Sequence, residues 1–318
     1  MSTAAADALA PLAELPGVAE AVSDARRAVD RLYGHRVMRR RADEVTAESV
    51  LRGARASAAL DGADWPLEEV RRRTDYGADA EARRVGGALR VTAESGQLLS
   101  AWRHSPLQVL ARLHLLATGD AEAEAGAGAG AGFRSGSGAG SAVGRPRLAG
   151  EAIEELLPLD LPAADSLGPD GLPEVPDFPL PAAPSADEAA ARLDALARLL
   201  VDRVDRKAPA TAAPALVVAA VVHGELLTLR PFASHNGLVA RAAQRIVLIS
   251  EGLDPKGICP AEVGLVELGT DAYRGALGGY ASGTQEGMAA WIAHCARALR
   301  LGMRESTAVC EAMQRGMA

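Results

Sequence analysis

The residues with the clearest chemical potential form a short polar break between two apolar segments, at positions 229–241. The pair Asn236-Gly237 favours a tight turn, and a helix that begins there presents backbone N–H groups without helical partners. Such a helix start attracts anions such as phosphate. Arg241 lies one turn inside, where its guanidinium can reach the same anion or pair with a carboxylate. The residues alone also fit an ordinary helix–loop–helix corner with Arg241 in solvent.

The other titratable residues give little support to metal or nucleophilic chemistry. An imidazole is suited to proton transfer near neutral pH, and His235 lies in the polar break, but we expect its side chain to point away from position 230. His223 lies within an apolar helical segment and is predicted to be a core residue. The three cysteines are far apart and form no CxxC pair, which favours reduced thiols over a disulfide or a zinc site. No metal site is predicted.

Composition indicates one or two globular domains with ample core material. The chain has 318 residues, 48% of them apolar, and a net charge of -7. This acidity argues against general affinity for nucleic acid. The only basic cluster, expected to be a solvated surface, comprises Arg36, Arg39, Arg40 and Arg41.

Neither export nor membrane insertion is indicated by the sequence. Residues 1–16 lack the basic start and the long apolar stretch of a signal peptide. The longest apolar stretch, residues 215–229, contains His223 and Glu225 and falls short of the roughly 18 apolar residues of a membrane span. We therefore expect a cytoplasmic protein without membrane contact.

Helical periodicity runs through most of the chain. A helix that begins at Ser185 carries a capping-box pattern, with Glu188 three residues later. A second helix is expected to end near Asp61-Gly62, where glycine supplies a left-handed cap. No segment alternates long enough for a sheet, so the predicted class is all-α. The expected helices cover about 18–33, 46–59, a short turn after Trp65-Pro66, two within 81–117 broken at Ser105-Pro106, 185–204, 215–229, 238–250, and two more that carry Tyr273 and Trp291.

Two stretches interrupt this helical pattern. Residues 121–141 alternate Ala and Gly, do not satisfy GxGxxG, and are predicted to be a mobile loop rather than a dinucleotide site. Residues 158–184 are proline-rich and are predicted to be irregular and extended over the surface. The expected organisation is an N-terminal helical region at 1–120, a Gly/Ala/Ser-rich flexible loop at 121–147, and a core at 148–318.

The polar break resembles the signature of the Fic (Fido) family, HPFx[D/E]GNGRxxR. Pro231, Phe232, Asn236, Gly237 and Arg241 match it in register. The preceding segment with His223 resembles the helix that leads into the motif, and the segments with Tyr273, Leu277 and Trp291 resemble the closing helices. The resemblance implies the Fic/Fido helical fold, with an N-terminal helical extension and at most a short β-hairpin flap.

An upstream segment resembles a second element of the same family. Residues 57–62, Ser-Ala-Ala-Leu-Asp-Gly, are similar to the inhibitory helix motif [S/T]xxxE[G/N], with Asp61 in place of Glu. The resemblance implies an inhibitory role for Ser57, Asp61 and Gly62. In that role the carboxylate pairs with Arg241, either directly or through a water because Asp is one methylene shorter than Glu.

Four departures from the motif bear on catalysis. Family members transfer AMP from ATP to protein hydroxyls with the motif's His as general base, but Arg230 stands there and guanidinium keeps its proton. Ser234 replaces the acidic residue that holds magnesium, so magnesium is doubtful. His235 replaces the first glycine, and Leu238 replaces the first arginine. His235 is the one alternative base in the loop.

The resemblance therefore implies a degenerate family member. Such a pseudoenzyme would be unable to carry out ordinary ATP-dependent AMPylation of protein hydroxyls. Binding of ATP, another nucleotide or phosphate by Asn236, Gly237 and Arg241 remains open. The alternative is a non-catalytic regulatory or interaction scaffold whose former cleft binds an unidentified protein partner. Nucleic-acid binding through the basic cluster is the third and least supported interpretation.

Overall fold

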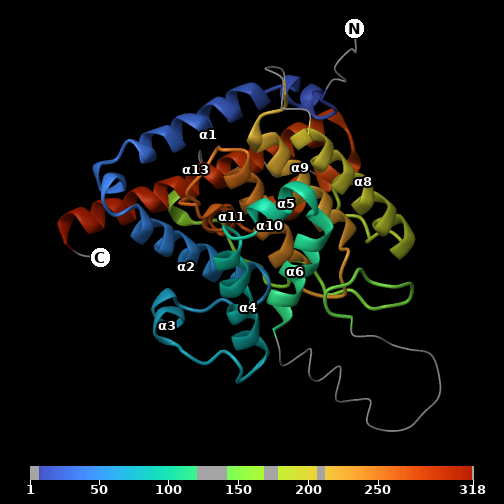
Figure 1. Ribbon diagram of the computed structural model, residues 1–318, viewed down its shortest axis with the longest axis horizontal. Helices are drawn as coiled ribbons and strands as arrows, with labels where there is room; N and C mark the ends of the chain where they lie inside the picture. The colour runs from blue at the N-terminus through green and yellow to red at the C-terminus, as the bar shows by residue number, and fades with distance from the viewer. Residues whose placement is uncertain (1–6, 120–141, 168–177, 206–211, 317–318) are drawn as a thin grey trace.

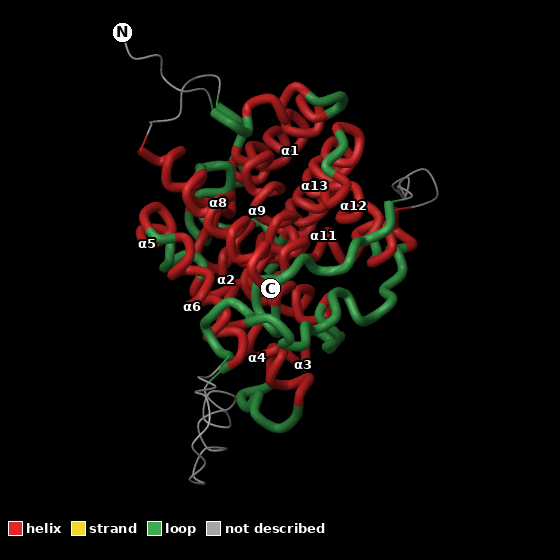
Figure 2. Tube along the Cα trace, turned by 90° about the vertical axis from the view of Figure 1, so that its right-hand side faces the viewer, coloured by secondary structure: helices red, strands yellow, loops and turns green. Residues whose placement is uncertain are grey.

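The computed structural model describes residues 7–119, 142–167, 178–205 and 212–316. Within these ranges all regular secondary structure is helical and no strand occurs, which confirms the all-α prediction (Figure 2). The optional hairpin flap is absent from the part of the chain described. The loop predicted at 121–141 lies outside it, as does the middle of the proline-rich stretch. The described parts of 158–184 are irregular apart from one turn of 3-10 helix at Asp165–Leu167.

The N-terminal helices follow the predicted pattern with one correction. Instead of two helices within 81–117 there are three, because the chain also breaks around Gly96, and glycine is a poor helix former. Ser105 leaves the helical region ahead of Pro106, as expected of a residue before proline. The elements are a 3-10 helix Ala10–Glu14, α1 Val18–Tyr33, a 3-10 helix η2 Arg36–Arg39, α2 Ala42–Leu60, α3 Leu67–Arg72, α4 Ala80–Glu94, α5 Leu99–His104 and α6 Pro106–Thr118.

The C-terminal helices confirm the prediction of three consecutive helices between 186 and 250. The Ser185 hydroxyl accepts a hydrogen bond of 3.2 Å from the Glu188 N–H, which is the first half of the expected capping box. The second helix of the three has the predicted bounds. The elements are α8 Ala186–Asp205, α9 Ala215–Leu229, α10 Asn236–Ser250, α11 Ala261–Leu268, α12 Thr270–Ser282 and α13 Gln285–Arg315.

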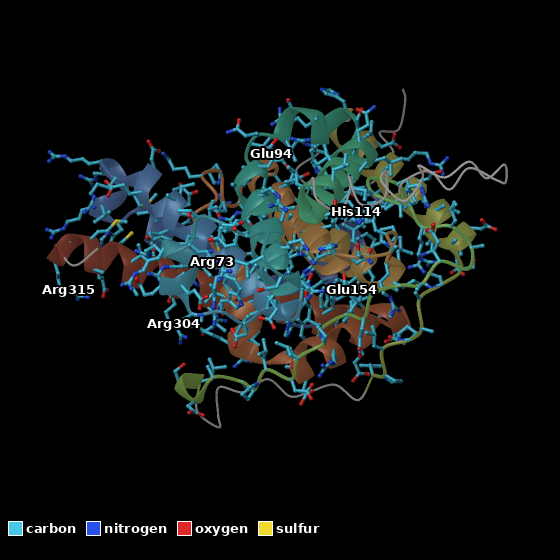
Figure 3. The ribbon with its side chains drawn as sticks, turned by 90° about the horizontal axis from the view of Figure 1, so that it is seen from below. Arg73, Glu94, His114, Glu154, Arg304 and Arg315 are labelled. Atoms are coloured by element: carbon cyan, nitrogen blue, oxygen red, sulfur yellow. The ribbon has the colours of Figure 1, made fainter. Side chains whose placement is uncertain are left out.

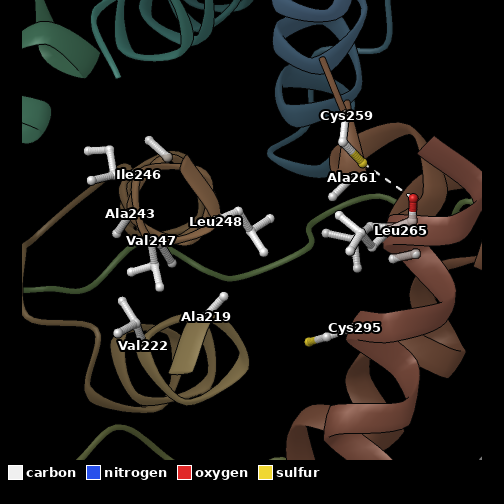
Figure 4. Packing of buried hydrophobic residues seen from close by; sticks show 14 of the residues in the cluster. Ala219, Val222, Ala243, Ile246, Val247, Leu248, Cys259, Ala261, Leu265 and Cys295 are labelled. Carbon is white, nitrogen blue, oxygen red and sulfur yellow. Dashed lines mark hydrogen bonds between the residues drawn. The ribbon is translucent and has the colours of Figure 1, made fainter. Parts of the chain in front are cut away.

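The α9–α10 pair lies at the centre of the molecule, and the helices packed against it are α2, α4, α5, α6, α8, α12 and α13 (Figure 1). Thirteen of the fifteen α9 residues are buried, which explains why its sequence is apolar on every side. Figure 4 shows Val247 of α10 pointing toward the helix that carries Ala219 and Val222. Gly224 permits the close approach of the outer helices, since a Cβ there would lie 2.7 Å from the Tyr280 ring and 2.8 Å from Trp291 Nε1. This packing fixes the turn between α9 and α10.

Candidate functional site

The turn between α9 and α10 is held by strained backbone and by one side chain. Arg230 and His235 both have left-handed backbone, with φ of 45° and 58°, a conformation that is uncommon for residues with a side chain. Asn236 braces the turn from within. Its Oδ1 accepts from the Phe232 N–H at 3.0 Å and its Nδ2 donates to the Phe232 carbonyl at 2.8 Å. Both ends of the Asn236 amide therefore bind the backbone of the turn itself.

The carboxylate of Asp61 fills the N-terminus of α10. Its Oδ2 accepts from the Leu238 N–H at 3.2 Å, and its Oδ1 accepts from Arg241 Nη2 at 2.5 Å. Gly237 makes this approach possible, because a Cβ there would overlap Asp61 Oδ1 and lie 2.9 Å from the guanidinium. Gly62, with φ of 99°, ends α2 directly after the aspartate. An anion thus occupies the position that the sequence predicted for one.

Arg241 is the most deeply buried cation of the site, with 1% of its side chain exposed. Its Nε donates to Ser57 Oγ at 2.7 Å and its Nη2 to the Ser57 carbonyl at 3.0 Å. Burial alone would lower the pKa of Arg241, but the Asp61 carboxylate and the Tyr273 hydroxyl raise that pKa above its ordinary value. The predicted contact between Asp61 and Arg241 is present, and it is direct rather than bridged by water.

Arg241 Nη1 is left without a hydrogen-bond partner among the described residues. Both N–H groups of Nη1 therefore lack an acceptor among these residues, whereas Nε and Nη2 are satisfied.

A second carboxylate, which sequence reasoning missed, also contacts the turn. Glu154 Oε2 accepts from the His235 N–H at 2.7 Å, and the same carboxylate is ion-paired with Arg84 of α4. Although burial by itself would raise the pKa of Glu154, the His235 N–H and the nearby cations lower the pKa below its ordinary value. Nothing local in the sequence marks Glu154, because an irregular loop brings it to the turn.

The loop that carries Glu154 runs along the turn. The Arg147 N–H donates to the Pro231 carbonyl and the Glu154 N–H to the Ala233 carbonyl, each at 2.8 Å. The Arg147 side chain donates to the Arg230 carbonyl at 2.8 Å and the Leu229 carbonyl at 3.4 Å. These are the last carbonyls of α9, which favour a cation because they form the negative end of the helix dipole. The loop therefore supplies opposite charges to the two helix ends.

Arg230, at the position of the family's general base, faces the protein rather than an open cleft. Its Nη2 donates to the Pro181 carbonyl at 2.8 Å. Burial and the neighbouring Arg147 lower the pKa of Arg230. A guanidinium still cannot act as a base at neutral pH, even with its pKa moderately lowered. Arg230 therefore holds the 178–184 segment against the turn by this hydrogen bond and does not serve as a base.

His235 lies beside a second histidine from α6. Its Nδ1 is 2.8 Å from Ser234 Oγ, and its ring meets that of His114 edge-on with centroids 6.4 Å apart. His114 stacks on Phe232, and its Nδ1 accepts from the Gly144 N–H at 2.9 Å. Burial lowers the pKa of His114 to about 4. His114 and Glu154, labelled in Figure 3, are two flanking groups that the motif pattern did not include.

His223 is a core residue, as predicted. It is fully buried, and its Nε2 lies 2.7 Å from the Tyr273 hydroxyl. Burial lowers the pKa of His223 well below its ordinary value, so the ring is neutral. Its ring packs against Tyr273 and Trp291 in the core.

The described residues offer neither a metal-binding cluster nor a membrane-spanning helix. They contain no group of three or more His, Cys, Asp or Glu side chains placed to hold a metal ion. None of their helices combines the length and the apolar character needed to cross a membrane.

Comparisons with known proteins identify the fold. No family model matches the sequence, and no curated protein matches it. Among solved structures, the chain is similar to the crystal structure of a Fic family protein from Desulfovibrio desulfuricans G20. The two share 18% sequence identity with a TM-score of 0.58, over 92% of this chain and 75% of that chain. The chain therefore has the fold seen in a Fic family structure, as the motif resemblance implied, and at this identity the likeness establishes the fold alone.

Proposed function

We propose that this chain is a degenerate Fic protein that keeps an anion site at the α10 N-terminus and holds it closed with its own carboxylate. The observation that carries the proposal is Asp61, which binds both the Leu238 N–H and Arg241. A carboxylate and a phosphate group are both anions that accept hydrogen bonds from a helix N-terminus and a guanidinium. The buried Asp61 carboxylate therefore occupies a site that could bind a phosphate group. Phosphate, ATP or another nucleotide is the ligand class proposed.

The same proposal excludes ordinary adenylyl transfer. Arg230 supplies no base, and the absence of a positioned base costs roughly 10²- to 10⁴-fold in rate. Leu238 is fully buried and apolar where the family has an arginine. His235 is not proposed as a replacement base, since its Nδ1 faces Ser234. Self-AMPylation and AMPylation of a target protein are therefore both expected to be absent.

Magnesium does not fit the residues at this turn. The Ser234 hydroxyl is a neutral ligand, and it already lies 2.8 Å from His235 Nδ1. Glu154 is the nearest carboxylate along the turn, and it is used by Arg84 and by the His235 N–H. Nucleotide binding without a metal is the form of binding proposed.

Calorimetric titration with ATP and with ADP, each with and without magnesium, tests the proposal. The unmodified protein should bind weakly or not at all, whereas Asp61→Ala should bind with an affinity that does not depend on magnesium. Asp64→Ala is the matched control, because Asp64 lies three residues away in an exposed pair with Arg55. If Asp61→Ala keeps its helical circular dichroism yet binds neither nucleotide nor inorganic phosphate, the proposed anion site does not exist.

A non-catalytic regulatory or interaction scaffold is the second candidate, and Glu154 is the observation that favours it. Two internal carboxylates at one turn leave little reason to expect a small-molecule ligand. On this alternative, Asp61→Ala combined with Glu154→Ala would still bind no nucleotide. A cytoplasmic location accompanies both candidates as a proposal, which fractionation of expressing cells would test.

A further inference from the structure

Most arginines of this acidic chain are paired, but a group at the end of α1 is not. The net charge is -7, and most exposed arginines elsewhere face carboxylates, as Arg41 does with Glu44 at 2.5 Å. Within the described ranges, four exposed arginines close together in sequence make neither an ion pair nor a side-chain hydrogen bond. They are Arg31, Arg36, Arg39 and Arg40. Their positive charge is available to a ligand.

A groove of about 410 Å³ lies between α1 and α13, and Arg31 is the one of these four arginines that lines it. The two helices run side by side along one edge of the molecule (Figure 1). The groove has arginines on its walls and apolar residues on its floor. They are Arg31, Arg300 and Arg304 on the walls, and Ala28, Leu32 and Met303 on the floor. A groove of this size holds a few side chains rather than a broad surface.

One of the wall arginines can exchange its present partner for a ligand. Arg300 lies 3.4 Å from Asp24 and Arg304 lies 2.5 Å from Glu267, and both arginine side chains are about half exposed. The Arg300–Asp24 pair is partly exposed and contributes little to stability, so a ligand carboxylate can replace Asp24 at small cost. The Glu267 side chain is only 19% exposed, so its pair with Arg304 is kept. Arg31 needs no such exchange.

We propose that this groove, independently of the motif turn, is a docking site for a short acidic peptide segment of a protein partner. Guanidinium groups bind carboxylates in a two-pronged geometry, and the apolar floor accepts an aliphatic side chain between the acidic ones. A long nucleic acid is disfavoured, because Asp24, Glu267 and Glu311 flank or line the groove and the whole chain is acidic. A short segment needs only a few of the arginines, whereas a long polyanion would also meet the carboxylates that lie among them.

Fluorescence anisotropy tests this site with a labelled hexaglutamate peptide that carries a central leucine. The test variant is Arg31→Glu with Arg36→Glu, in which both positions are exposed and unpaired. The control variant is Arg103→Glu with Arg198→Glu, which changes net charge equally at two exposed positions on α5 and α8. We expect the test variant to weaken binding by about tenfold or more and the control to weaken it by less than about twofold, with binding that weakens as salt is added.

Three results would overturn the assignment. One is equal weakening by the test and control variants, which indicates unspecific attraction. Another is tighter binding of a labelled oligothymidylate of the same charge, which indicates a nucleic-acid surface. The last is no binding of the peptide at low salt. Circular dichroism of each variant verifies that the helical fold is retained, so that a loss of binding is attributable to the groove.

Discussion

Removing the carboxylate of Asp61 should destabilise the protein, and an external anion should reverse the loss. In Asp61→Ala, the buried guanidinium of Arg241 keeps its two Ser57 contacts and the neighbouring Tyr273 hydroxyl but loses its counter-ion, and the Leu238 N–H loses its acceptor. Breaking a buried pair by removing one partner costs about 3–5 kcal/mol. For a chain of this size, that loss corresponds to a fall in Tm of roughly 4–7 °C.

The assay is urea unfolding followed by circular dichroism, with and without inorganic phosphate. Phosphate at about 100 times its Kd should restore about 2.7 kcal/mol to Asp61→Ala, because a ligand that binds only the folded state stabilises it by mass action. The unmodified protein should gain much less, since its site is already filled. A loss below about 1 kcal/mol in the variant, or equal stabilisation of both proteins by phosphate, would refute the interpretation of a plugged anion site.

Three further outcomes are expected. The purified protein should transfer no label from labelled ATP to itself, and Arg230→His alone should not restore transfer, because the other three departures act on the same transition state; transfer by the unmodified protein would contradict this. Adding Glu154→Ala to Asp61→Ala should tighten phosphate binding about tenfold, as expected when a charge-assisted hydrogen bond of about 1.5 kcal/mol becomes available to the ligand at the His235 N–H. The free energy of unfolding should fall as pH drops from 7 toward 4. The pKa of His114 is lowered to about 4 in the folded protein, so over this pH range the unfolded chain binds a proton at His114 and the folded chain does not. His114→Gln should lessen that slope, measured by urea unfolding at several pH values, whereas the exposed control His104→Gln should leave it unchanged.

The central helices were predictable because their signals are local and redundant. α9 is apolar on every side, and Pro231 and Gly237 mark the break before α10. The contact of Asp61 with Arg241 was expected from the motif resemblance, and the two side chains do meet. Composition and periodicity alone would not have paired them, since they are far apart in sequence.

The positions of Glu154 and Arg147 could not be predicted from the sequence, and the reason is physical. Glu154 and Arg147 lie in an irregular loop, where neither a 3.6-residue period nor a cap determines which way a side chain points. Their positions depend on backbone hydrogen bonds to the turn, at the Pro231 and Ala233 carbonyls. Such long-range pairing has no signature in one sequence. The extra break around Gly96 was missed for a simpler reason, because an isolated glycine within an apolar period is easily taken as part of the helix.

The charges around the turn follow from the direction of the two central helices. α9 ends at the turn and presents carbonyls, which Arg147 satisfies, while α10 begins there and presents N–H groups, one of which Asp61 satisfies. Each helix end therefore already has the counter-charge that its dipole favours. An incoming anion therefore competes with the carboxylates for the N–H groups at the start of α10. It does not compete with Arg147, which is itself a cation and binds the carbonyls at the end of α9. Opening this site consequently requires displacement of the Asp61 carboxylate at the end of α2, whereas α9, α10 and the loop that carries Arg147 can stay in place.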